Sequence, residues 1–152
     1  MVLHVGLHGG HTSYDIEQSS GRLGYSMPDV DGERWSDELS EEVWPSGIFP
    51  DSLVSTFDVA EVQRRCGKNE RFEVKASDGV GRYLCGFVYY TSLANYESME
   101  KGGEKPVLFL HTPFCPTQED LDKGREAVIK VVESMVSIWL ERNGEKISTR
   151  NG

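Results

Sequence analysis

The sequence is poor in basic residues and in long apolar runs, and each deficit excludes a class of protein. Lysine and arginine number 16 against 25 aspartates and glutamates, so the formal net charge is −9. Nucleic acids and anionic membranes are bound through basic surfaces, so we expect neither nucleic acid nor a membrane as a partner. No segment approaches the roughly 18 consecutive apolar residues of a membrane-spanning helix. The first residues resemble neither a basic leader nor a secretion signal, which favours a soluble, cytoplasmic protein.

Cysteine is also scarce. The three cysteines, Cys66, Cys85 and Cys115, form an odd set without a CxxC motif. This pattern is typical of free thiols in a reducing compartment rather than of a disulfide framework. A length of 152 residues suits one domain. We expect that domain over residues 1–146 and a frayed tail over 147–152.

Hydrophobic periodicity predicts strands that alternate with helices. Residues 21–50 carry no clear period and are predicted to be a functional or disordered loop. The last helix is expected to end at Asn143-Gly144. The alternation predicts an α/β fold, a three-layer α/β/α arrangement around a mostly parallel sheet. The predicted strands cover 2–7, 71–76 and 106–111, and the predicted helices cover 58–66, 82–93 and 117–143.

Three segments bring reactive side chains to the expected sheet edge. In open α/β sheets the functional site lies beyond the carboxyl ends of the strands. We expect Glu17 in the loop after the first strand, Cys85 in the first turn of a helix, and His111 at a strand end. A thiol at a helix N-terminus is stabilised as a thiolate, an imidazole can share its proton, and a carboxylate can orient that imidazole. The pattern is therefore compatible with a cysteine nucleophile.

Each of these residues also has a plainer interpretation. Cys85 lies among apolar residues and can pack as a small hydrophobic side chain. His111 can be a structural histidine at the end of a strand, and Glu17 can be a solvated acid in a loop. Cys66 and Cys115 have no partner at motif spacing, so they are expected to pack in the core or lie at the surface.

A group of histidines near the N-terminus raises the question of a metal. His4, His8 and His11 lie close together in sequence, but no cysteine or acid falls at a recognised ligand spacing. A metal site needs three or four convergent ligands. We therefore expect no metal and no cofactor.

Read as motifs, the same segments resemble the pyroglutamyl-peptidase I family of cysteine peptidases, also called pyrrolidone-carboxylate peptidases. Gly81-Arg-Tyr-Leu-Cys85 with Tyr89-Tyr-Thr-Ser-Leu93 resembles the family's nucleophile segment. Phe109-Leu-His111-Thr-Pro113 resembles its histidine strand. His4-Val-Gly6 and the later Glu17 resemble the segment of its catalytic glutamate, although the residues around Glu17 depart from the usual Pro-Glu-Arg. The resemblance covers almost the whole chain in the right order.

The resemblance implies a reaction and a catalytic triad. Cys85 would attack the amide carbonyl that links an N-terminal pyroglutamyl residue to the next residue. His111 would take the thiol proton and return it to the leaving amine, and Glu17 would hold the imidazole. Water would then hydrolyse the thioester. The implied partners are pyroglutamyl-blocked peptides, and association of several copies is left open.

One departure from the family is large. Its members normally begin with a strand and a Gly-Phe-x-Pro-Phe loop that lines the lactam pocket, and this chain has no such motif. We therefore expect an N-terminally truncated sheet with an exposed edge, and little activity from the isolated chain. The alternative is a catalytically weak relative that acts as a binding or interaction protein.

Overall fold

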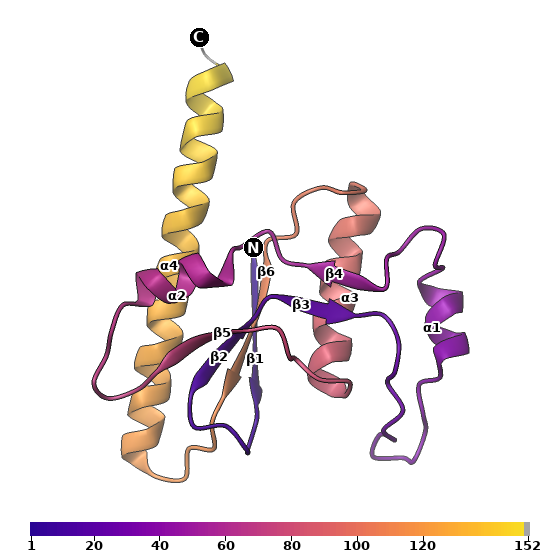
Figure 1. Cartoon of the computed structure of the whole chain (residues 1–152), viewed down its shortest axis with the longest axis horizontal. Coiled ribbons are helices and arrows are strands. Elements are labelled where there is room, and N and C mark those ends of the chain that lie inside the picture. The colour runs from indigo at the N-terminus through magenta and orange to yellow at the C-terminus, as the bar shows by residue number, and fades with distance from the viewer. Residues whose placement is uncertain (151–152) are drawn as a thin grey trace.

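The chain folds into an α/β domain with one central sheet and one small accessory sheet (Figure 1). The computed structural model describes the backbone of residues 1–150 and the side chains of residues 1–144. In chain order the elements are β1 (Val2–Leu7), β2 (Tyr14–Glu17), β3 (Ser19–Gly21), α1 (Asp37–Val43), β4 (Ser52–Val54), α2 (Val59–Cys66), β5 (Val74–Ser77), α3 (Leu84–Met99), β6 (Val107–Thr112) and α4 (Gln118–Arg150).

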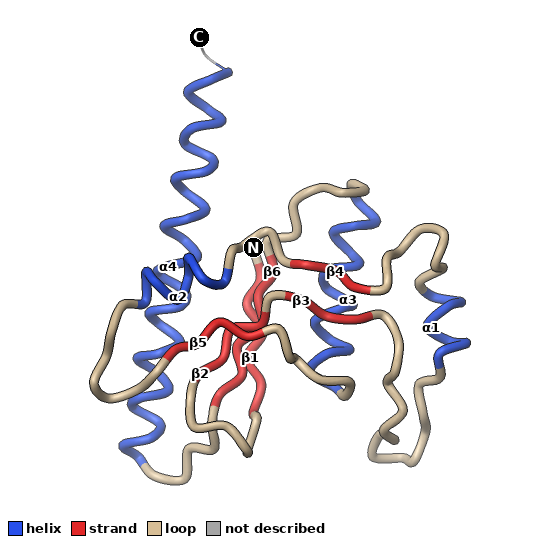
Figure 2. The backbone as a smooth tube through the Cα atoms, in the orientation of Figure 1, coloured by secondary structure: helices blue, strands red, loops and turns tan. Residues whose placement is uncertain are grey.

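The central sheet is mixed but mostly parallel, as predicted. Its strand order is β1-β6-β2-β5. β1 pairs with β6 and β2 pairs with β5 in parallel, whereas β2 and β6 are antiparallel. The antiparallel strands β3 and β4 form a separate ribbon that extends toward α1 (Figure 2).

Helices cover both faces of the central sheet, which confirms the three-layer arrangement. α2 and α4 lie on one side and α3 on the other (Figure 1). Side chains of successive strand residues point to opposite faces, so each strand contributes to two cores. β6 directs Leu108 and Leu110 toward α2 and α4, and it directs Val107 and Phe109 toward α3.

Local signals explain where several helices begin. The Asp58 carboxylate accepts hydrogen bonds from the backbone N–H groups of Ala60 and Glu61, so it caps α2. The α2 helix ends at Gly67, whose φ of 71° lies in the left-handed region that favours glycine. At the start of α4 the Thr117 hydroxyl accepts from the backbone N–H of Asp120, which caps the helix.

Several sequence-based boundaries are wrong. The strand predicted over 71–76 is shorter and later, β5 at Val74–Ser77. The stretch 21–50 includes α1, which begins after Ser36 with its hydroxyl accepting from the N–H of Leu39. The last helix continues through Asn143-Gly144 to Arg150, because one glycine weakens a helix without ending it. The expected frayed tail, 147–152, reaches past the described residues and stays a prediction.

Candidate active site

A buried acid–imidazole pair lies between β2 and β6. Oε1 of Glu17 is 2.8 Å from Nδ1 of His111, and both side chains are almost fully shielded from solvent. In the antiparallel register Glu17 lies opposite Phe109, so His111 is its diagonal neighbour on the same face. Side chains in this relation are within reach of each other. The fold thus brings together two groups that are 94 residues apart in sequence.

The sequence placed Glu17 in the loop after the first strand, but Glu17 is the last residue of a separate strand, β2. Its side chain is buried, so the plainer interpretation as a solvated acid is wrong. β2 runs opposite to β6, so the carboxyl end of β2 faces the middle of β6 rather than its carboxyl end. The pattern Tyr14-Asp-Ile-Glu17 alternates apolar and acidic residues, but four residues are too few for this alternation alone to identify a strand.

The hydrogen bonds of Glu17 keep its carboxylate ionised. Burial alone would raise the pKa of the Glu17 carboxyl. Hydrogen bonds from His111, from Ser77 and from the backbone N–H of Gly79 outweigh burial, so the pKa lies below its ordinary value. The Gly79 N–H is 2.9 Å from Oε2. A carboxylate that stays charged can orient an imidazole and stabilise its cationic form.

A residue of α3 also fixes the position of this carboxylate. The Tyr89 hydroxyl is buried and donates a hydrogen bond of 2.9 Å to the backbone carbonyl of Glu17. Tyr89 therefore fixes the end of β2 from the helix that carries Cys85. Sequence reasoning singled out the Tyr89-Tyr-Thr-Ser-Leu93 motif but assigned Tyr89 no such position.

Cys85 lies in the first turn of α3, as predicted, next to the β1 residue that pairs with His111. Gly6 is opposite His111 in the parallel register of β1 and β6. A Cβ atom added to Gly6 would lie 3.1 Å from Sγ of Cys85 and 2.7 Å from Cζ of Phe109. Glycine at this position therefore leaves the space that Cys85 and Phe109 occupy. The thiol, the imidazole and the carboxylate gather on the α3 side of the sheet.

The ionisation of Cys85 differs from the prediction. We expected the helix N-terminus to favour the thiolate, but burial raises the pKa of the Cys85 thiol. A hydrogen bond from its own backbone N–H lowers the pKa, and the negative charge of Glu17 raises it further, so the net shift is upward. The thiol is therefore protonated near neutral pH and needs a base to become a nucleophile.

The other two cysteines lie apart from this group. Cys66 is buried between α2 and α4, with its Sγ 3.7 Å from the Ser134 hydroxyl, and burial raises the pKa of its thiol. The Cys115 thiol donates to the backbone carbonyl of Pro113 at 3.2 Å. Both placements agree with the expected packing or surface roles.

Two loop histidines and one acid join the site without having been assigned to it. His8 packs edge to face with His111, and His11 stacks on His8. Asp15 is opposite His111 in the register and contacts His11. In the part of the chain whose side chains are described, no group of three histidines, cysteines or acids is arranged to hold a metal ion.

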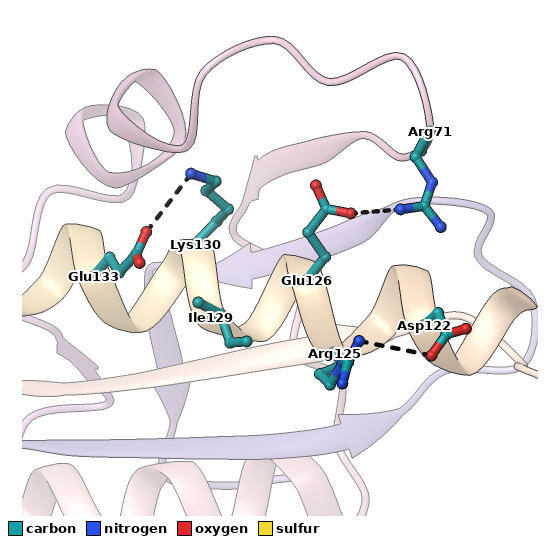
Figure 3. A pocket seen from close by; sticks show the side chains of 7 residues that line it. All are labelled: Arg71, Asp122, Arg125, Glu126, Ile129, Lys130 and Glu133. Carbon is teal, nitrogen blue, oxygen red and sulfur yellow. Dashed lines mark hydrogen bonds and ion pairs between the residues drawn. The ribbon is translucent and has the colours of Figure 1, made fainter.

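A hollow elsewhere on the surface is lined mostly by exposed charged side chains rather than by a buried pair. The hollow, of about 320 Å³, lies along α4, and its charged side chains pair with one another (Figure 3). Arg71 contacts Glu126 at 2.8 Å there, and Lys130 lies 3.6 Å from Glu133. Because these charges are already partnered and solvated, this hollow is less suited to chemistry than the buried pair. Within residues 1–150, no helix is both long enough and apolar enough to span a membrane.

The sequence is similar to proteins whose names describe one activity. No protein-family model matches the sequence. The chain is 28% identical to pyrrolidone-carboxylate peptidase of Pyrococcus furiosus over 152 residues, covering 93% of this chain and 69% of that protein. It is 29% identical to human pyroglutamyl-peptidase 1 over 148 residues, covering 97% of this chain and 65% of that protein.

Solved structures agree with the sequence matches. The crystal structure of the Pyrococcus furiosus pyrrolidone carboxyl peptidase superposes with a TM-score of 0.66 at 27% identity, and it covers 92% of this chain and 68% of that one. The chain thus spans about two thirds of the length of these relatives. In sequence and in fold, it is a homologue of the pyroglutamyl-peptidases, the enzymes also named pyrrolidone-carboxylate peptidases.

Proposed function

We propose that the chain is a cysteine peptidase that removes N-terminal pyroglutamyl residues from peptides. Cys85 is the nucleophile, His111 is the general base and then the general acid, and Glu17 orients the imidazole. The observation that carries the proposal is the buried 2.8 Å contact between Glu17 and His111, on the same side of the sheet as Cys85. The names of the homologous enzymes support the choice of substrate.

The reaction proceeds in two acyl-transfer steps. Nδ1 of His111 is engaged by Glu17, which leaves Nε2 to accept the proton of the Cys85 thiol. Sγ attacks the carbonyl carbon of the pyroglutamyl residue, and the tetrahedral intermediate collapses as Nε2 protonates the leaving amine. Water then attacks the thioester carbonyl, with His111 taking its proton. Pyroglutamate leaves, and the proton returns to the thiolate.

The raised pKa of Cys85 determines when His111 removes the thiol proton. The thiol is protonated in the resting site, so His111 removes the proton as the sulfur attacks rather than holding a preformed thiolate. Backbone N–H groups in the first turn of α3 are available to the oxyanion that forms on the carbonyl oxygen. The helix N-terminus therefore serves the intermediate more than the resting thiol.

The substrate imposes its own requirements. A pyroglutamyl residue carries a lactam in place of a free α-amine, so its binding site needs apolar contacts together with partners for the lactam N–H and C=O. The three free thiols suit a reducing compartment, and we place the enzyme in the cytoplasm.

A fluorogenic pyroglutamyl amide tests the proposal directly. We expect slow turnover by the wild-type chain that falls to background in Cys85→Ala and in His111→Ala. Cys66→Ala is the matched control, because this thiol lies between α2 and α4, and its turnover should equal that of the wild type. Circular dichroism on each variant establishes that the fold is retained.

A covalent probe adds a second measurement that does not require complete turnover. A pyroglutamyl chloromethyl ketone should alkylate Cys85, as read by peptide mass spectrometry, and His111→Ala should slow this reaction strongly. A folded wild-type chain that neither cleaves the amide nor reacts with the probe at Cys85 would disprove the proposed activity. Turnover that survives both active-site substitutions would disprove the assigned residues.

A further inference from the structure

Two histidines of the β1–β2 loop lie over the outer side of His111. The centroid of the His8 ring is 5.3 Å from that of His111, with the two planes at 80°. His11 stacks on His8 with centroids 3.6 Å apart and planes 25° apart. His8 is exposed and His11 half-buried, whereas His111 is only 1% exposed. The two loop rings therefore form a layer between the buried imidazole and solvent.

Backbone hydrogen bonds hold this loop against β6. The N–H of His8 donates to the carbonyl of Thr112 at 2.9 Å, one residue beyond His111. The N–H of His11 donates to the carbonyl of His8 at 3.0 Å, which closes a turn. The stacked rings are thus anchored to the strand that carries the proposed base, at the end where the loop joins β1 and β2 in Figure 1.

Asp15 fixes the outer ring of the stack. It lies directly opposite His111 in the register of β2 and β6 and is 7% exposed. Its Oδ2 is 2.5 Å from Nδ1 of His11, and its Oδ1 accepts a 2.7 Å hydrogen bond from the Ser13 hydroxyl. β2 therefore presents two carboxylates on one face, each with its own imidazole: Asp15 contacts His11, and Glu17 contacts His111.

We propose that His11, held by Asp15, and His8, stacked on it, are positioning residues that fix the orientation of the His111 ring. This inference rests on the proposed function of His111 as the base. Glu17 holds one ring nitrogen, Phe109 packs against the ring with centroids 4.9 Å apart, and His8 adds an edge-to-face contact on the loop side that limits tilting of the ring. A base whose Nε2 is held toward the attacking sulfur loses less rate to misalignment.

The carboxylate of Asp15 lies beside both imidazoles, because Asp15 contacts His11 and is directly opposite His111 in the register. The titratable groups that face this region are Glu17 and Asp15 on β2, Cys85 on α3, His4 on β1, and His8 and His11 on the loop.

NMR spectra of the His111 ring at one fixed pH test the inference. We expect the ring resonances of His111 to shift in His8→Ala and in Asp15→Asn, and to stay near their wild-type positions in His8→Phe, which keeps a ring beside His111. His4→Phe is the control, because His4 stacks on Phe109 and bonds to Ser92 rather than to the loop rings. It should leave the His111 resonances unchanged.

Kinetics of His8→Ala test the positioning itself. Because His8 is exposed, the fold should tolerate its loss, and thermal unfolding verifies this. We expect kcat on a pyroglutamyl amide to fall about tenfold with KM unchanged, and His8→Phe to restore most of the loss. Equal kcat in His8→Ala and the wild type would overturn the positioning role.

The two measurements separate this inference from the proposed function. The NMR spectra require no turnover, so shifted His111 resonances in a chain that cleaves nothing would refute the peptidase activity and keep the positioning role of the two histidines. Turnover that depends on Cys85, together with His111 resonances that are unmoved in His8→Ala and Asp15→Asn, would refute the positioning role alone.

Discussion

The two faces of the central sheet have the same strands but different contents. Toward α2 and α4, β2 and β6 present Ile16, Leu108 and Leu110, all fully buried in an apolar cluster. Toward α3 the same two strands present Glu17 and His111, equally buried but hydrogen-bonded to each other. One face supplies hydrophobic stabilisation, and the other holds ionisable groups at fixed positions.

The difference follows from the two-residue period of a strand. Neighbours such as Leu110 and His111 are one position apart in sequence and on opposite sides of the sheet. The apolar cluster can therefore fix the backbone of β6 without occupying the space of the site. A polar pair buried in this way needs a rigid scaffold, because each group is costly once its partner moves away.

Substitutions at His111 and Leu110 give the most direct test of the difference between the two faces. On the α3 face, His111→Ala removes the proposed base, and we expect turnover of a pyroglutamyl amide to fall by about 10³-fold or more. Steady-state kinetics with active-site titration measure the loss. Residual activity within tenfold of the wild type would contradict the division of the two faces.

On the opposite face, Leu110→Ala should affect stability rather than chemistry. The side chain is fully buried in the apolar cluster, so we expect the free energy of unfolding to fall by about 2–5 kcal/mol. Urea unfolding followed by circular dichroism measures this change. Turnover per folded molecule should stay near the wild-type value, and a loss as large as that of His111→Ala would show that the two faces are not independent.

The ionisation of the Glu17 carboxylate makes the stability of the fold depend on pH. Its pKa is below the ordinary value near 4.5 in the folded chain, because hydrogen bonds outweigh the burial that would raise it. It therefore stabilises the fold above about pH 4.5, and this contribution is lost as the pH falls through the folded-state pKa. Glu17→Gln should lose stability relative to the wild type at pH 6.

The pH series supplies the measurement. In urea unfolding between pH 6 and 3, the gap between the wild type and Glu17→Gln should close by up to about 1.4 kcal/mol per pH unit below pH 4.5. A gap that widens on acidification would reverse the assigned direction of the shift. Leu110→Ala is the comparison from the other face, since its loss should not depend on pH in this range.

The alkylation rates of Cys85 and Cys66 give another comparison of the two faces. Burial raises the pKa of both Cys85 and Cys66, so alkylation of each by iodoacetamide should accelerate as the pH rises from 7 to 9. Cys85 is half-exposed and Cys66 is buried, so Cys85 should react faster by about tenfold. Peptide mass spectrometry gives both rates in one sample.

Removal of the negative charge of Glu17 should change the alkylation rate of only one of the two thiols. The negative charge of Glu17 contributes to the raised pKa of Cys85, so Glu17→Gln should speed alkylation of Cys85 at pH 7 and leave Cys66 unchanged. Equal labelling of both cysteines, or no effect of Glu17→Gln, would count against the electrostatic coupling within the site.

Much of this fold could be predicted because its signals are local. Asp58 and Gly67 bound α2, Thr117 starts α4, and the apolar run of β6 is found within one residue of its predicted place. A cap and a turn depend on side chains within a few residues of the backbone that they satisfy. Such elements can be read without knowledge of the rest of the chain.

The missed elements depend on distant contacts. β2 is only four residues long and becomes a strand because β5 and β6 pair with it on either side. A short acidic and apolar segment between glycines gives little local indication of such pairing. The resemblance to a peptidase family implied that Glu17 holds the imidazole of His111, whereas the burial of Glu17 at the end of a strand could be seen only in the folded chain.

The positions of Asp15, His8 and His11 illustrate the same limit. Their contacts arise from the register of β2 against β6 and from the path of the loop that precedes β2. A shift of the register by one residue would place Asp15 and Glu17 on the opposite face. The histidines lie close together in sequence, which raised the possibility of a metal site. In the structure, the rings of His8 and His11 lie next to His111 instead.

The smallest predicted effect concerns the edge of the sheet, where β1 leaves one side of its backbone unpaired by the other described strands. Val5 and Leu7 on this strand are 52% and 59% exposed. Exposed apolar edges favour pairing with another chain, and an inserted lysine discourages it. Val5→Lys should thus reduce concentration-dependent association while changing the free energy of unfolding by only about 0.5 kcal/mol. Ile48→Lys, equally exposed but outside the sheet, is the matched control, and light scattering over a concentration series compares them. If both lysines reduce association equally, general surface charge rather than the strand edge governs it.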